Sequence, residues 1–146
     1  MLKNYTSGIP VSKSVAYIEQ LLARNGVKQI GKHYDGGRLI GIFFIIEVNG
    51  SDVPFKLPAR VAECERVLTE NLSRRARPET RKKIPQQAER TAWKILSDWI
   101  EAQMAMVELS RVELMEIFLP FVWDADSDKT FFEELKERSF KGLLPG

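Results

Sequence analysis

The chain has 146 residues, of which 44% are hydrophobic and 29% charged, so its composition is that of one globular domain rather than a disordered chain. Its net charge of +2 is small but unevenly divided, because residues 1–83 carry 15 Lys/Arg against 8 Asp/Glu and residues 84–146 carry 7 against 12. One cysteine excludes an intrachain disulfide and a cysteine-rich zinc site, and we expect a reducing, cytoplasmic location. No apolar run approaches the ~18 residues of a membrane span.

The first half of the chain alternates helical and extended patterns, separated by strong turn signals. Asp35-Gly36-Gly37 and Asn49-Gly50 tolerate positive φ and predict two tight hairpins. In chain order we expect a polar arm (1–10), a helix ending at Asn25-Gly26, strands over 27–34, 38–48 and 52–57, and a helix starting at Pro58.

The middle strand, RLIGIFFIIEV (38–48), has no polar face. Leu39, Phe43 and Ile45 should point to one side of the sheet, and Ile42 and Phe44 to the other. Both faces therefore need a cover. We expect the first two helices to cover one face and the Trp- and Met-rich helices after Pro85 to cover the other; a homodimer that buries the second face is the competing explanation.

The second half of the chain has a helical pattern that begins after a basic segment. SRRARPETRKK (73–83) breaks the helical pattern and predicts a loop, and Pro85 should open the longest helix, with Trp99 and Met106 on its buried side. Capping-box patterns at Ser110/Glu113 and Thr130/Glu133 predict a helix over 111–119 and a last short one.

These elements predict the α+β class, with a three-stranded antiparallel sheet in α-β-β-β-α order and additional C-terminal helices covering the second face. We expect a single domain over residues 1–146. Its parts are an α-β-β-β-α core (1–74), a basic loop (75–84) and a helical C-terminal part (85–146).

The basic segment 73–83 is the best candidate for a nucleic-acid-binding site. Clustered cations neutralise phosphates and release counterions whatever the base sequence, although a charge run is also the ordinary composition of a solvated loop. Lys28, Lys32 and Arg38 on the first hairpin could extend the patch. The cations of the segment itself are Arg74, Arg75, Arg77, Arg81, Lys82 and Lys83.

Other motifs favour structural roles. Phe43, Phe44 and Phe55 could stack on bases but fit core packing better. Asp124, Asp126 and Asp128 resemble the start of a calcium loop that lacks the glycine and glutamate such loops need later. His33 is the only histidine, and no catalytic or phosphate-loop motif is present, so we expect no enzyme, cofactor or metal site.

Two resemblances add expectations. The first five elements resemble the double-stranded-RNA-binding domain in their order. That family binds phosphates with a lysine-rich start of its last helix. The matching stretch here is PARVAECE, in which Arg60 is the one basic residue. The chain is also similar to a family of small uncharacterised proteins of phages and mobile elements. The similar segments are NYTSGIPVSKSVAYIEQLLARNG, YDGGRLIGIFFIIEVNG with VPFKLPARV, and AERTAWKILSDWIEAQMAMVE. That resemblance implies a cytosolic accessory protein and assigns no functional residue.

The sequence therefore leaves two hypotheses about function. The first is a non-catalytic accessory protein that binds nucleic acid, DNA or RNA, through the basic segment. The second is a protein-interaction module, either an inhibitor of a host factor, with a host or phage protein as partner, or a self-assembling subunit. No membrane partner is expected.

Overall fold

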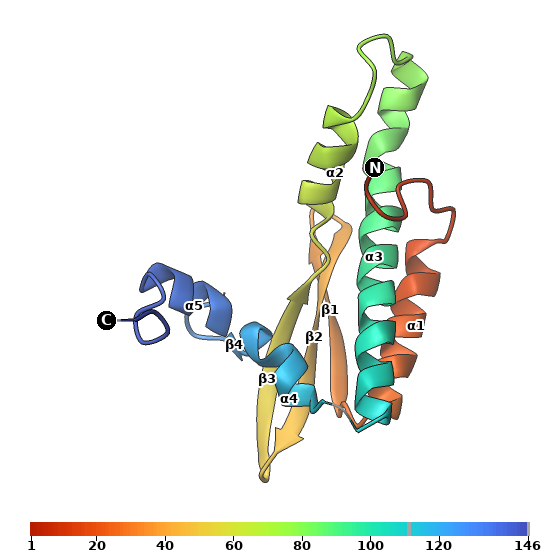
Figure 1. Cartoon of the computed structure of the whole chain (residues 1–146). Helices are drawn as coiled ribbons and strands as arrows, with labels where there is room; N and C mark the ends of the chain where they lie inside the picture. Colours follow the sequence, from red (N-terminus) through yellow and green to blue (C-terminus); the bar gives the residue numbers. More distant parts are fainter. Residues whose placement is uncertain (111, 146) are drawn as a thin grey trace.

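The computed structural model describes residues 1–110 and 112–145 and confirms the α+β class (Figure 1). A helix, three antiparallel strands and a second helix come in the predicted order, and further helices follow. The elements are α1 (Val11–Arg24), β1 (Gln29–Asp35), β2 (Arg38–Val48), β3 (Ser51–Pro58), α2 (Val61–Glu70), α3 (Pro78–Glu108), α4 (Leu114–Phe118), the 3₁₀ helix η1 (Leu119–Phe121), β4 (Trp123–Asp124), β5 (Lys129–Thr130) and α5 (Phe131–Glu137).

Two tight turns build the sheet, whose strand order is β1-β2-β3. Gly36 and Gly37 have φ of 57° and 81°, and Asn49 and Gly50 have φ of 51° and 82°. Two consecutive residues of positive φ match the right-handed twist of the paired strands, which is why the sequence signal for both hairpins was reliable.

A bulge in β2 changes which side chains face the core. His33 pairs with Gly41 but Tyr34 pairs with Leu39, so Ile40 is an extra residue opposite β1. The alternation of faces is therefore interrupted, and Leu39 packs against the core instead of lying beside Phe43 as predicted.

The core lies on one face of the sheet. Helices α1 and α3 lie side by side on that face, and the buried residues of both join those of β2 and β3 in a single cluster (Figure 1). The prediction that the long helix covers the second face is wrong, because Trp93, Ile100 and Met104 of α3 pack into the same core as α1. The predicted buried stripe was also misplaced, since Trp99 is only partly buried and Met106 is 41% exposed.

The C-terminal segment covers part of the second face. Val122 forms a bridge with Phe55 on the outer edge of β3, and the Trp123 ring then packs on Phe43, with ring centroids 4.9 Å apart. Phe43 and Ile45 are half-buried, whereas Ile42 and Phe44 are fully buried. A short hairpin therefore provides what the sequence assigned to a long helix.

Helix α3 begins earlier than predicted. Its first turn starts at Pro78, and Pro85 lies inside the helix. Pro78 suits the first turn, because the N–H groups there have no partner inside the helix. Pro85 is less favourable, because an interior proline removes one helical hydrogen bond and crowds the carbonyl four residues earlier, and the sequence pattern therefore favours a helix start at Pro85. Most of the predicted loop over 75–84 is consequently helical, from Pro78 onward.

The last helices follow local capping chemistry. Thr130 and Glu133 form the predicted capping box at the start of α5. At α4 the box is formed by Glu113 and Glu116 rather than by Ser110 and Glu113, so α4 starts at Leu114. The first residue of the predicted helix over 111–119 lies outside the described residues.

The N-terminal arm, residues 1–10, is docked on α3. The Asn4 amide donates to Asp98 Oδ2 at 2.9 Å, and the Thr91 hydroxyl donates to the Asn4 carbonyl at 2.9 Å. Gln87 Nε2 donates to the Ser7 carbonyl at 3.0 Å. These bonds give the polar arm a fixed path along the helix.

Candidate functional site

The turn between α2 and α3 is an exposed basic tip. It projects beyond the end of the sheet at the top of Figure 1, and the Ser73 carbonyl and hydroxyl organise it by accepting hydrogen bonds from nearby backbone N–H groups. We define the basic tip by six exposed cations: Arg74, Arg75, Arg77, Arg81, Lys82 and Lys83.

These six charges are not neutralised within the part of the chain that the structure describes. No Asp or Glu of residues 1–110 or 112–145 lies within 4.0 Å of any of them in an ion pair, and Glu79 is the only acidic residue of the segment. Arg81, Lys82 and Lys83 also lie in the first turns of α3, where the helix dipole adds positive potential.

The hairpin cations are placed differently. Lys28 Nζ lies 3.2 Å from Asp52 Oδ1, and Lys32 Nζ lies 3.7 Å from Glu19 Oε1. Lys28 precedes β1 at the end of the sheet that holds the Asn49-Gly50 turn, which is opposite to the end nearest the basic tip. The structure therefore does not bring these two lysines to the tip as free cations.

Arg38 is a structural crosslink. Its guanidinium lies 2.7 Å from Glu89 of α3 and 3.0 Å from Glu65 of α2, and it also donates to the Pro85 carbonyl at 3.0 Å. The hydrogen bonds to Glu89 and then to Glu65 raise the pKa of Arg38 above its ordinary value. Its charge is therefore used to join the first hairpin to both helices.

The aspartates that resemble a calcium loop have other partners. Asp128 accepts hydrogen bonds from Lys56 Nζ at 3.0 Å and from Trp123 Nε1 at 2.9 Å, and these bonds lower the pKa of its carboxyl. Asp124 accepts from the backbone N–H of Asp126. Among residues 1–110 and 112–145 no group of three His, Cys, Asp or Glu is placed to hold a metal ion.

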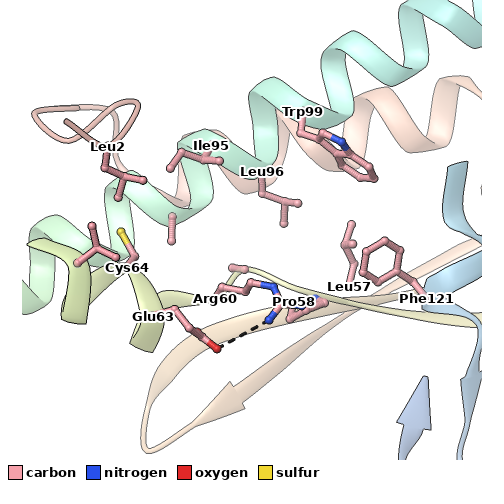
Figure 2. A pocket seen from close by; sticks show the side chains of 13 residues that line it. Leu2, Leu57, Pro58, Arg60, Glu63, Cys64, Ile95, Leu96, Trp99 and Phe121 are labelled. Carbon is pink, nitrogen blue, oxygen red and sulfur yellow. Dashed lines mark ion pairs between the residues drawn. The ribbon is translucent and has the colours of Figure 1, made fainter. Parts of the chain in front are cut away.

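Sequence reasoning missed an apolar groove of ≈ 360 Å³ between α3 and the junction of β3 with α2 (Figure 2). Its walls come from five parts of the chain, so no single segment carries a signal for it. The residues that line it are Leu2, Leu57, Pro58, Ala59, Arg60, Glu63, Cys64, Val67, Ala92, Ile95, Leu96, Trp99 and Phe121.

Cys64 belongs to the floor of this groove. The residue is only 6% exposed, and burial raises the pKa of its thiol, so the unreactive protonated form dominates. Cys64 is therefore part of the hydrophobic core as well as of the groove. The thiol offers no nucleophile to the groove.

Comparisons of the chain with family models, with curated proteins and with solved structures found no match. Across residues 1–110 and 112–145, none of the helices has the length and apolar character needed to cross a membrane.

Proposed function

We propose that this chain is a non-catalytic accessory protein, of the kind found in phages and mobile elements, and that it binds nucleic acid through the phosphates. The observation that supports the proposal is the contrast in charge pairing: the six cations of the basic tip have no carboxylate partner among the described residues, whereas Lys28, Lys32 and Arg38 do. Unpaired, exposed guanidinium and ammonium groups can exchange water for phosphate without first breaking an internal ion pair.

The chemistry of the tip favours duplex over single-stranded nucleic acid. Single-strand binding relies on aromatic side chains that stack on exposed bases. Residues 69–92 contain no Phe, Tyr or Trp, and the next aromatic residue, Trp93, is buried. A tip that has only charge can contact a backbone but cannot hold unstacked bases.

The experiment is a binding titration of labelled duplex and single-stranded DNA and RNA over a salt series. If the tip contacts about four phosphates, log K should fall with log salt with a slope of about −3 to −4. Replacing Arg75, Arg81 and Lys82 together by alanine should weaken binding and flatten the slope by up to about three units.

The chain offers a matched control for that triple variant. Arg24, Lys28 and Lys32 are also exposed but each is paired with a carboxylate, so changing them to alanine alters the net charge by the same amount elsewhere. The control should retain affinity and slope. Equal losses in the two triple variants, or no binding at low salt, would contradict the proposal.

One observation favours a protein-interaction module as a second candidate. Large apolar side chains are exposed on the C-terminal part, among them Leu109, Leu119 and Phe132. Such side chains mark a protein contact when they form one contiguous surface. Sedimentation of the wild type and of a Leu119→Ser/Phe132→Ser double variant tests it: self-association that the variant loses, together with absent nucleic-acid binding, would favour this second function.

A further inference from the structure

The apolar groove has one charged pair at its rim and plays no part in the proposed contact with phosphates. We propose that the groove binds a small amphiphile that has an apolar chain and an anionic head, such as a medium-chain carboxylate. The chain would lie between α3 and the β3–α2 junction, and the head would bind the Arg60 guanidinium.

The walls of the groove suit an alkyl chain. Ile95, Leu96 and Trp99 project from α3 toward Leu57 and the other apolar residues on the opposite wall (Figure 2). The volume of ≈ 360 Å³ falls in the lower part of the range of about 300–1,000 Å³ that small-molecule sites occupy. Filling it would remove both wall and ligand surface from water.

The row of side chains that line the groove has apolar residues at both ends. Leu2 lies at one end of the row of lining side chains, and Trp99 and Phe121 lie at the other (Figure 2). A helix of a partner protein needs a groove that is open along several turns. The volume of ≈ 360 Å³ suits a short, flexible chain rather than a helix of several turns, and this favours a small ligand.

The rim provides the charge for the head group. Arg60 Nη1 lies 3.8 Å from Glu63 Oε1, and the two side chains are 62% and 56% exposed, so this ion pair is long and weak. Arg60 is also the N-cap residue of α2, where no side chain caps the free N–H groups. A ligand anion can therefore replace Glu63 beside Arg60 at the positive end of the helix.

The backbone of Arg60 adopts a left-handed conformation beside the groove. Its φ of 59° lies in the left-handed region, which is energetically costly for a residue other than glycine. Glycine would avoid that cost but would remove the guanidinium from the rim. Among the described residues that line the groove, Arg60 is the one cation, and its φ sets the direction in which its side chain leaves the backbone.

Calorimetric titration of the full-length protein with decanoate and with decanol tests the proposal. The two probes share an apolar chain, and only decanoate has a charged head. Decanoate should saturate one site and bind more tightly than decanol. Arg60→Gln should weaken decanoate binding about two- to fivefold, and Glu63→Gln should strengthen it by a similar factor, as expected for one exposed ion pair.

Arg66 and Glu70 provide a matched control, because they form an exposed ion pair on the same helix at 2.9 Å and do not line the groove. Arg66→Gln and Glu70→Gln should leave decanoate binding unchanged. The basic-tip triple variant should also bind decanoate normally, so this result is independent of nucleic-acid binding. Melting temperatures without ligand confirm that each variant is folded.

Three results would overturn the proposal. The first is no saturable binding of decanoate by the folded wild type. The second is equal affinity for decanol and decanoate, or an unchanged affinity in both Arg60→Gln and Glu63→Gln. The third is self-association that decanoate does not dissociate and that Leu96→Asp abolishes, because a second copy would then occupy the groove.

Discussion

At the scale of single residues, Trp93 and Trp99 of α3 have different environments: Trp93 is buried in the core, and Trp99 lines the groove. Trp93 is 0% exposed, and its Nε1 donates to the Leu39 carbonyl at 3.0 Å. Trp99 is partly buried, packs edge-on against Phe118 and lines the groove. The two positions should therefore respond very differently to truncation.

Trp93→Ala should lower the free energy of unfolding by about 3–5 kcal/mol, because it leaves a large cavity and an unpaired carbonyl. Trp99→Ala should cost about 2 kcal/mol, since part of its ring is already in water. Urea denaturation measures both. A larger loss for Trp99 than for Trp93 would show that the buried face of α3 is assigned wrongly.

At the scale of elements, Asp98 links the N-terminal arm to α3 by charge. It accepts from Lys94 at 2.7 Å and from Asn4 at 2.9 Å, and Lys3 lies at 3.3 Å. Burial alone raises the pKa of the Asp98 carboxyl, but the hydrogen bonds from Lys94, Asn4 and Lys3 outweigh burial and hold the pKa below its usual value. The docked arm is therefore sensitive to acid.

The sign of this effect follows from the lowered pKa. The carboxylate stabilises the fold fully above its unfolded-state pKa of about 3.9 and loses that effect as the pH falls through the lower folded-state pKa. Asp98→Asn should lower the free energy of unfolding at neutral pH, and the difference from the wild type should shrink as the pH falls below the unfolded-state pKa. Urea midpoints over this range measure it; a constant difference would contradict the explanation.

The sequence correctly predicted features that depend on neighbouring residues. It did not predict features that depend on packing between distant segments. The Asn49-Gly50 turn and the Thr130 capping box depend on neighbouring residues, and the structure confirms both. Whether a helix starts at Pro78 or Pro85 depends on packing against α2, which a local pattern does not contain. The bulge at Ile40 likewise depends on the partner strand, so Leu39 was assigned to the wrong face.

At the scale of the whole molecule, the sequence correctly predicted that the second face of the sheet is covered. It did not predict which segment covers that face. Apolar residues in the middle strand indicated two covered faces, because unpaired Phe and Ile side chains in water are costly. The cover comes from Trp123, far along the chain in a hairpin of two-residue strands. The apolar groove was beyond prediction for the same reason, since the arm, strand and helices that build it meet only in the fold.

Trp123 should therefore stabilise the whole molecule. Trp123→Ala removes its contact with Phe43 and its hydrogen bond to Asp128, and should cost about 2 kcal/mol. It should also increase the binding of a dye specific for apolar surface, as Phe43 becomes exposed. Tyr34→Ala, at a position 58% exposed, is the control and should stay within about ±0.5 kcal/mol.

The projecting basic tip should also be a site of proteolytic cleavage. Its irregular connection, residues 71–77, is exposed and rich in arginine, so trypsin should nick it before the helices and the sheet. Both fragments contribute to one core, because Ile42 and Phe44 pack with Trp93 and Ile100, and the nicked halves should stay together until denatured. Bound duplex should slow this cleavage, which would give a protease footprint of the contact without any substitution in the chain.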